Sequence, residues 1–307
     1  MSTAFISHPD CEKHWMGAAH PERPQRLGAI NDRLIASGLS LMLHHYEAPM
    51  ATREQLCRVH DAKYVDSIFN ESPQAGKLLW LDPDTAMNEY SLNAALRAAG
   101  AVVLAVDLVM TCQEQNAFCN VRPPGHHAEH NRAMGFCIFN NVAVGAAHAI
   151  EHHHLLRVAV VDFDVHHGNG TEDIFRNEPR VMLFSTFQHP FYPYSGADTH
   201  LPNMVNVPLP VGSRSAQFRQ AVEQYWLPAL NKFQPQLIMI SAGFDAHCDD
   251  DMAGLCLTDQ DYAWVTNHVK NIAEKYAQGR IVSTLEGGYE LDSLARSAHA
   301  HIAALAE

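Results

Sequence analysis

The fold is decided by residues 158–171, VAVVDFDVHHGNGT, in which an apolar run is followed by acidic and histidine side chains. The run Val158–Val161 is continuously apolar, which predicts a strand that is covered on both faces, as in a parallel sheet. Asp162, Asp164 and His166 come directly after it, where such a strand ends. The stretch therefore predicts a buried strand that delivers titratable side chains to one edge of a parallel sheet.

The same pattern recurs along the chain. Further short apolar runs are at 117–121, 181–184, 237–240 and 281–282, and helical stretches between the runs are at 140–152, 215–233 and 259–277. No internal repeat, low-complexity tract or linker interrupts this alternation. Strands that alternate with helices over the whole length predict one doubly wound α/β domain, residues 1–307, with a mainly parallel sheet.

Composition excludes several classes of protein. The chain has 307 residues, 47% of them hydrophobic and 18% charged, which is typical of a globular enzyme and not of a disordered protein. Its 34 acidic and 21 basic residues give a net charge of −13, so no nucleic-acid partner is expected, because phosphate binding needs clustered Lys and Arg. The 21 histidines indicate metal or proton chemistry.

The cysteines and the apolar segments indicate in which cellular compartment the protein is expected. The seven cysteines include no Cys-x-x-Cys pair, and an odd count in a chain of this size predicts reduced thiols in a cytoplasm. The N-terminus shows no signal-peptide pattern, and the apolar stretch Ala101–Met110, which Asp107 interrupts, is far shorter than the ~20 residues that span a bilayer. We expect a cytoplasmic protein with no membrane partner. The sequence is compatible with a homo-oligomer.

Three other predicted strands are also followed by polar side chains, namely His126 and His127, Asp245, and Tyr289. In a parallel sheet, ligands bind beyond the carboxyl ends of the strands, so all of these side chains should meet at one rim. This convergence predicts an active site at the rim.

Three of the rim residues are suited to hold one metal ion. Asp164 and His166 are two residues apart and point the same way in extended chain, and Asp245 is the natural third ligand. Three protein ligands that leave a position for water are typical of catalytic zinc, although two carboxylates and one imidazole also suit Fe²⁺ or Co²⁺. The alternative is that these side chains only cap a helix or bind backbone donors.

The remaining rim residues indicate the chemistry. His126 and His127 follow a rigid Pro-Pro-Gly turn. They could be further ligands or a structural pair, but with three ligands assigned, proton transfer from an activated water fits them better. Asp162, on the opposite face of the strand from Asp164, could orient one of the two rings. Tyr289 follows two glycines and could place its phenol against a developing oxyanion.

Six motifs that run through nearly the whole chain resemble those of the zinc-dependent histone deacetylase superfamily, which includes acetylpolyamine amidohydrolases and acetoin-utilisation proteins. They are HPERPQR (20–26), RPPGHHAE (122–129), GFCIFNNVAVGAAHA (135–149), VDFDVHHGNGT (161–171), SAGFDAH (241–247) and LEGGY (285–289). The PGHHAE motif and Asn169 are similar to the class II branch. The resemblance implies a single α/β domain with an eight-stranded parallel sheet, related to arginase.

The resemblance also assigns roles at the rim. The zinc ligands that it implies are Asp164, His166 and Asp245. It implies that His127 is the general base, that His126 pairs with Asp162, and that Tyr289 polarises the amide carbonyl. Asn169 stands where other classes have an Asp, which implies that His127 lacks a charged partner.

The substrate-binding residues that the resemblance implies are Gly135, Phe136, Tyr192 and Met252. Phe136 and Tyr192 correspond to the two walls of a tunnel for the acyl-lysine stem, where many relatives have Phe in place of Tyr192. Met252 stands where polyamine-selective relatives carry a Glu at the pocket mouth, so this apolar residue favours acyl-lysine. The neighbouring acidic run 249–251 could still attract cationic substrates.

The resemblance further implies a structural potassium ion. The residues that would hold it are Asp162, Ser185 and Thr186, with the backbone around Asp164 and His166.

The predicted function is therefore the zinc-dependent removal of acyl groups from lysine side chains of peptides or proteins, or from small acetylated amines. An acetylpolyamine deacetylase, an arginase-like binuclear hydrolase and a non-catalytic binder of acetylated ligands are the alternatives. Asp245-Ala246-His247 lacks the second carboxylate that a binuclear site needs, which favours a single metal. The tract His152–His154, at a predicted helix end, is interpreted as solvated surface.

Overall fold

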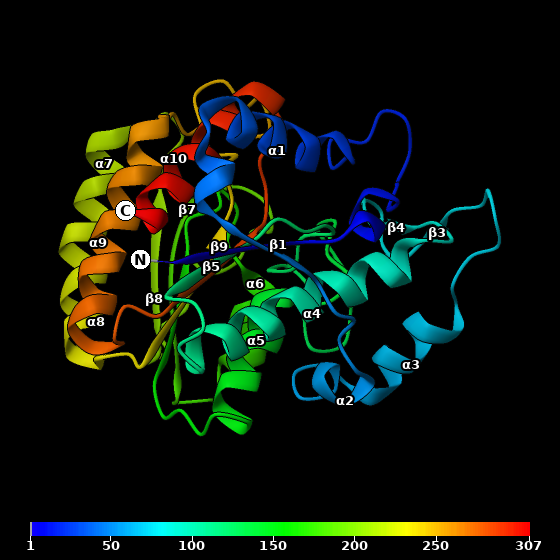
Figure 1. Ribbon diagram of the computed structural model, residues 1–307, viewed down its shortest axis with the longest axis horizontal. Helices are drawn as coiled ribbons and strands as arrows, with labels where there is room; N and C mark the ends of the chain where they lie inside the picture. Colours follow the sequence, from blue (N-terminus) through cyan, green and yellow to red (C-terminus); the bar gives the residue numbers. More distant parts are fainter. Residues whose placement is uncertain (1) are drawn as a thin grey trace.

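The computed structural model describes residues 2–307, and an eight-stranded sheet forms its centre (Figure 1). The strands of this sheet are β1 (Thr3–Ser7), β2 (His44–Glu47), β5 (Asn116–Cys119), β6 (Val158–Asp162), β7 (Val181–Gln188), β8 (Met204–Leu209), β9 (Leu237–Ala242) and β10 (Ile281–Leu285). Their order across the sheet is β2-β1-β5-β10-β9-β6-β7-β8, and every neighbouring pair is parallel. The expected eight-stranded parallel sheet is confirmed.

Helices cover both faces of this sheet. They are α1 (Gln25–Ser37), α2 (Arg53–Leu56), α3 (Ala62–Asn70), α4 (Ser91–Met110), α5 (Asn141–Glu151), α6 (Asn169–Phe175), α7 (Ser215–Ala221), α8 (Leu227–Phe233), α9 (Asp259–Tyr276) and α10 (Leu291–Ala306). α4 and α5 pack together on one face, and α9 and α10 pack together on the other (Figure 1). A separate short hairpin consists of β3 (Leu79–Trp80) and β4 (Ala86–Met87).

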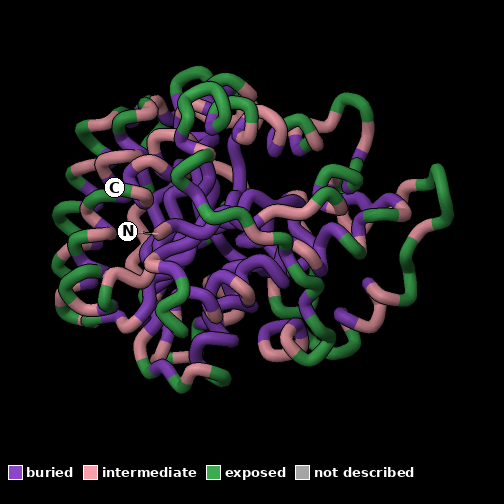
Figure 2. The backbone as a smooth tube through the Cα atoms, viewed as in Figure 1, coloured by how far each residue is buried: buried purple, intermediate pink, exposed green. Residues whose placement is uncertain are grey.

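Burial follows the apolar runs of the sequence. All residues of β5, β6, β9 and β10 are buried, as the absence of polar–apolar alternation in these runs predicts. Figure 2 shows the buried residues gathered in the sheet and on the inner sides of the helices, with exposed residues on outer turns and loops. The core therefore holds the strands rigidly, and the loops at their carboxyl ends carry the polar side chains.

The predicted helices are confirmed with one refinement. The stretches 140–152 and 259–277 form α5 and α9. The stretch 215–233 is helical throughout, but a π-helical segment, Val222–Trp226, separates α7 from α8.

Two expectations need correction. Cys248 and Cys256 form a disulfide, so the prediction that all seven cysteines are reduced is wrong for this pair. The chain doubles back after β9, where the Cys248 N–H donates to the carbonyl of Leu257 at 2.9 Å, and this brings the two cysteines together. The apolar segment 101–110 is part of α4, whose 20 residues are long and apolar enough to cross a membrane. Because 72% of its apolar window is buried inside the protein, α4 serves here as a core helix.

Candidate active site

The rim of the sheet collects its polar side chains from four strand ends. Two histidines follow β5, two aspartates and a histidine lie at and beyond the end of β6, and single residues follow β9 and β10. These residues are His126, His127, Asp162, Asp164, His166, Asp245 and Tyr289. Because all four strands are parallel neighbours or near neighbours in the sheet, the structure brings these residues together at one place.

Asp164, His166 and Asp245, here called the metal triad, have ligand atoms within 4.8 Å of one another. The Nδ1 atom of His166 lies 3.0 Å from Oδ1 of Asp164 and 3.2 Å from Oδ2 of Asp245. All three side chains are buried. Backbone N–H groups hold both carboxylates: Gly287 donates to Asp164 at 2.8 Å, and Val165 donates to Asp245 at 3.0 Å.

The metal triad fits a bound dication. Oδ2 of Asp245 is buried, and its 3.2 Å contact with Nδ1 of His166 lacks the geometry of a hydrogen bond, so among residues 2–307 it has no hydrogen-bond partner. Burial and the nearby Asp164 carboxylate raise the pKa of Asp245 to about 6, so an ionised Asp245 calls for a positive partner. A Cβ atom on Gly287 would lie 2.0 Å from Oδ2 of Asp245, and a Cβ on Gly243 would lie 2.0 Å from Oδ2 of Asp164. Because both positions are glycine, space remains beside the two carboxylates.

The donor set limits the choice of ion. One imidazole and two carboxylates suit Zn²⁺, Fe²⁺ and Co²⁺, whereas Mg²⁺ and Ca²⁺ prefer sites made of oxygen alone. Two carboxylates also balance the charge of a dication, which matters in a buried site.

The two rim histidines have different hydrogen-bond partners, and their pKa values are shifted in opposite directions. His126 donates from Nδ1 to Asp162 at 2.9 Å. Burial disfavours its charged form, but Asp162 and Asp164 raise the pKa of His126 well above its usual value. The rings of His126 and His127 are 4.0 Å apart, and burial together with the charge of His126 lowers the pKa of His127 well below its usual value. The structure therefore favours a cationic His126 beside a neutral His127.

The orientation of His127 is set by a chain of two hydrogen bonds. Asn169 donates from Nδ2 to the Glu129 carboxylate at 2.8 Å, and its Oδ1 lies 2.7 Å from Nδ1 of His127. Because a carboxylate only accepts, Glu129 fixes the Asn169 amide so that its oxygen faces His127. Nδ1 of His127 must then carry the proton, which leaves Nε2 as the free base.

A pocket of about 150 Å³ opens over the metal triad. It is lined by Asp84, His127, Gly135, Phe136, His166, Phe191, Tyr192, Met252 and Tyr289. The ring of Phe136 meets that of Tyr289 edge to face at 5.8 Å, and Tyr192 meets His127 in the same manner at 5.3 Å. All four residues expected to contact the substrate lie on this pocket.

Two lining residues were missed from the sequence. Phe191 stacks on the ring of His166 at 5.5 Å, and its place beside Tyr192 in the Phe-Tyr-Pro turn was the available signal. Asp84 lies in the turn between β3 and β4, far from any strand end of the main sheet, so no pattern pointed to it. Burial and the nearby Asp82 carboxylate raise the pKa of Asp84 to about 6.

The residues expected around a potassium ion lie just behind the rim. Ser185 and Thr186 are buried in β7, and Ser185 is the register partner of Asp162 in β6. Asp162 also accepts from the backbone N–H of Asp164 at 3.1 Å.

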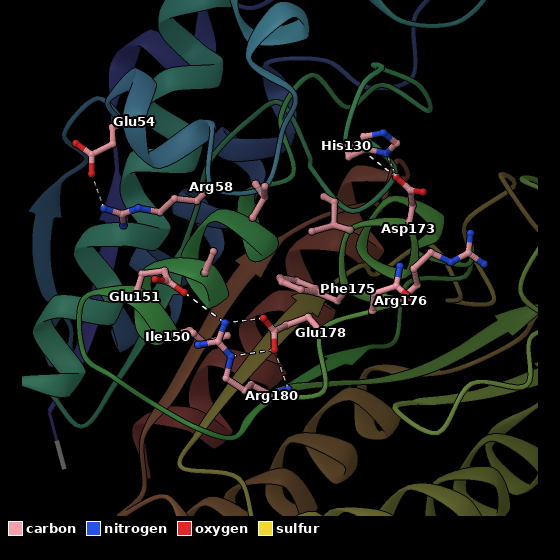
Figure 3. A pocket seen from close by; sticks show the side chains of 14 residues that line it. Glu54, Arg58, His130, Ile150, Glu151, Asp173, Phe175, Arg176, Glu178 and Arg180 are labelled. Carbon is pink, nitrogen blue, oxygen red and sulfur yellow. Dashed lines mark hydrogen bonds and ion pairs between the residues drawn. The ribbon is translucent and has the colours of Figure 1, made fainter.

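A separate cavity lies between α2, α5 and α6, with a volume of about 870 Å³ (Figure 3). Most of its charged wall residues are paired with one another. Arg58 bonds Glu54 at 3.1 Å, Arg180 bonds Glu178 at 2.6 Å, and His130 pairs with Asp173 at 2.6 Å. None of the expected site residues lines this cavity.

Comparison with known proteins agrees with the geometry. A model of the histone deacetylase domain matches residues 20–305. A probable deacetylase of Archaeoglobus fulgidus is 36% identical over 95% of this chain and 82% of its own length, and a histone deacetylase-like amidohydrolase of Pseudomonas aeruginosa is 38% identical over 89% and 73%. Polyamine deacetylase HDAC10 of Homo sapiens is 37% identical over 97% of this chain, which spans 47% of that protein.

Comparison with solved structures leads to the same family. The crystal structure of the HDA15 HD domain superposes with a TM-score of 0.94 at 35% sequence identity, and the match covers 99% of this chain and 88% of that one. The chain is thus a hydrolase that acts on amide bonds and belongs to the histone deacetylase family.

Proposed function

We propose that the chain removes acetyl groups from lysine side chains, with Zn²⁺ as its metal. The observation that carries this proposal is the meeting of the metal triad, the histidine pair and Tyr289 at the floor of one narrow, aromatic-walled pocket. Such a pocket suits a slender acyl-amine stem and leaves little room for a bulky substrate. The histone deacetylase family is zinc-dependent, and the donor set of the triad fits that metal.

Each residue at the floor has a distinct task in amide hydrolysis. A zinc ion held by the metal triad supplies Lewis acidity when bound. Nε2 of His127 takes up a proton as general base. Asp162 keeps His126 protonated, and the positive charge of His126 stabilises negative charge that develops nearby. Desolvation raises the pKa of Tyr289 well above its usual value, so the phenol keeps its proton and can donate it in a hydrogen bond to the carbonyl oxygen.

The acidic run 249–251 gives weak support to a polycationic substrate. Asp249 is paired with Arg296 at 2.8 Å. Asp250 is buried and accepts from the backbone N–H of Tyr289 at 2.6 Å, so it anchors the loop that carries the phenol. Asp249 and Asp251 are both exposed, but Asp249 is already paired with Arg296, so Asp251 is the better placed to attract a cation. Met252 beside it lines the pocket.

An acetylpolyamine deacetylase is the second candidate, and Asp84 is the observation that favours it. Its carboxylate lies on the wall of the pocket, close to Asp82. One of the relatives is named a polyamine deacetylase. A negative wall near the pocket would attract a second ammonium group of an extended amine.

Kinetics with two substrate classes test the choice. We expect a higher kcat/KM for an acetyl-lysine peptide than for N-acetylated polyamines, and Asp84→Asn should leave this order unchanged. Asp251→Asn is the matched control for a solvent-exposed charge. If polyamines are preferred by about tenfold or more and Asp84→Asn removes the preference, the second candidate is the correct one. Such a preference should also fall below pH 6, where Asp84 becomes protonated and loses its charge.

A binuclear arginase-like site has less support. Within residues 2–307, the strand ends gather one group of three ligands, and His247 lies 3.1 Å from Asp259 in place of joining that group. Both rim histidines and Tyr289 are present, which argues against a binder without turnover.

We also propose a potassium ion behind the rim, held by Asp162, Ser185, Thr186 and the backbone around Asp164 and His166. The buried oxygen atoms of Asp162, Ser185 and Thr186 support it, since a hard monovalent ion prefers such ligands. Replacement of K⁺ by a bulky organic cation should lower the melting temperature of the zinc-loaded protein. An unchanged melting temperature would contradict the proposal.

A further inference from the structure

A second group of metal-ligand side chains lies in the helical layer. Asp107 comes from α4, His148 from α5, and His152 and His153 follow at the C-terminal end of α5. One nitrogen or oxygen atom from each of these four residues lies within 4.8 Å of the others. These residues are called the Asp107 cluster below.

The Asp107 cluster is separate from the rim. Asn140 caps the N-terminus of α5 and donates to the carbonyl of Ala128, next to the rim histidines. The cluster is at the other end of α5, which at 1.5 Å per residue is about 16 Å long. It shares no residue with the metal triad or the substrate pocket.

A single carboxylate oxygen organises the cluster. Oδ1 of Asp107 is 2.8 Å from Nε2 of His148 and 2.8 Å from Nε2 of His153. The ring of His152 stacks on the ring of His148 at 4.9 Å. The ring of His153 is perpendicular to the ring of His152, also at 4.9 Å. Three imidazoles thus surround one carboxylate, whereas an ordinary His–Asp pair has a single imidazole.

These donors suit a borderline transition-metal ion. Three imidazole nitrogens and one carboxylate oxygen are typical ligands of Zn²⁺, Co²⁺, Ni²⁺ or Cu²⁺ and unsuitable for Mg²⁺ or Ca²⁺. Metal–ligand bonds of about 2.0–2.1 Å in a tetrahedron place the ligand atoms roughly 3.3 Å apart. The two 2.8 Å contacts would therefore have to widen by only about half an ångström. His152 is exposed and His148 is buried, so an ion can enter from solvent onto a partly fixed ligand.

Arg58 opposes this binding. Its Nη1 lies 3.0 Å from Nδ1 of His148, and because a guanidinium only donates, Nδ1 must accept and Nε2 must carry the proton. A metal at Nε2 requires the reverse arrangement, with the proton on Nδ1. Arg58 would have to turn toward Glu54, which its Nη2 already contacts at 3.1 Å on the wall of the cavity between α2, α5 and α6 (Figure 3).

We propose that the Asp107 cluster is a second metal site, which binds a zinc-like divalent ion and fastens the end of α5 to α4. The site takes the same class of ion as the metal triad but has no position in the reaction. Its role is to stabilise the helical layer.

Metal stoichiometry tests the proposal. Chelator-stripped protein is titrated with Zn²⁺ in competition with a chromophoric chelator. We expect two equivalents at micromolar zinc for the wild type and one for His152→Ala/His153→Ala. Both replaced side chains reach solvent, and deacetylase turnover of the zinc-loaded variant verifies that it is folded. His154→Asn is the matched control: His154 is outside the cluster and has a φ of 55°, which Asn tolerates, so this variant should keep both equivalents.

A second pair of variants separates this proposal from the assignment of the active site. Asp164→Ala should retain one equivalent, and its combination with His152→Ala/His153→Ala should retain none. A wild type that binds one equivalent, or a His152→Ala/His153→Ala variant that still binds two, would overturn the second site. Two equivalents in Asp164→Ala would instead count against the metal triad.

Discussion

The metal triad and the Asp107 cluster use the same residue types in opposite proportions. The triad has two carboxylates and one imidazole, and all three side chains are buried. The cluster has one carboxylate and three imidazoles, and part of it is exposed to solvent. Two carboxylates neutralise a dication, which lowers the cost of burying it, whereas one carboxylate leaves a net positive charge that contact with solvent helps to stabilise.

The two groups also differ in what holds them. The carboxylates of the triad accept from backbone N–H groups of Val165 and Gly287, so the strands and their loops fix the ligands before any ion arrives. The side chains of the Asp107 cluster are held mainly by one another and by Arg58. A site fixed by backbone is suited to catalysis, which needs accurate placement, while a site on helix surfaces is suited to linking two elements.

Removal of a ligand should separate the two groups most clearly. Asp164→Ala takes one of two negative charges from a buried site, so we expect the loss of one zinc equivalent and of measurable deacetylase turnover. His152→Ala/His153→Ala should leave kcat within about twofold of wild type, because surface substitutions away from a site have small effects. Turnover and zinc content measured on the same preparations check this. Normal turnover in Asp164→Ala would remove that residue from the ligand set.

Tyr289→Phe should separate chemistry from metal binding within the rim itself. The phenol lines the pocket and lies outside the triad, so the zinc content should stay unchanged. Loss of one oxyanion donor lowers kcat by roughly 10²–10³-fold, because the interaction strengthens as negative charge develops. Steady-state kinetics with an acetyl-lysine peptide measure both parameters. A raised KM with an unchanged kcat would show that Tyr289 only binds substrate.

The rim could be predicted because its residues directly follow buried strands. Continuous apolar runs predict β6 and β9, and the parallel order of these strands places Asp164 and Asp245 at the same edge of the sheet. The edge strand β2 was not found, because its residues are mostly exposed and carry no apolar run. Asp84 was missed for a related reason, since it lies in a small hairpin whose packing over the pocket is a tertiary contact.

The Asp107 cluster shows the limit of the same reasoning. The interpretation of His152–His154 as solvated surface agrees with the exposure of His152 and His154. It is wrong for His153, whose side chain is mostly covered and lies 2.8 Å from the carboxylate of Asp107. The sequence could not reveal Asp107, which is 41 residues from His148 and meets it only because α4 packs on α5. His148 and His152 are four residues apart on one helix, and this spacing was the signal available.

Zinc should stabilise the protein in two steps if both groups bind. After the triad is filled by one equivalent, zinc at about 100 times the dissociation constant of the Asp107 cluster adds about 2.7 kcal/mol. For a chain of this size we expect a rise in melting temperature of roughly 4 °C. Mg²⁺ should produce no such rise, and neither should Zn²⁺ with His152→Ala/His153→Ala. Differential scanning calorimetry provides the measurement. Equal shifts of the melting temperature in the wild type and this variant would contradict zinc binding at the Asp107 cluster.

The smallest effect expected is a gain of affinity at the Asp107 cluster when Arg58 is replaced. Arg58→Gln substitutes a side chain whose amide oxygen can accept the Nδ1 proton of a metal-bound His148, where the guanidinium can only donate. Hydrogen bonds of this kind to a metal-ligating histidine are worth about 10-fold in affinity or more, so zinc should bind the cluster roughly tenfold more tightly. Arg58→Lys is the matched control, because an ammonium also lacks an acceptor and should give no gain. The metal triad does not contact Arg58, so its affinity should be the same in all three proteins. If Arg58→Gln weakens the second equivalent in the chelator competition, the guanidinium supports the cluster and does not oppose metal binding, and the tautomer inferred for His148 is wrong.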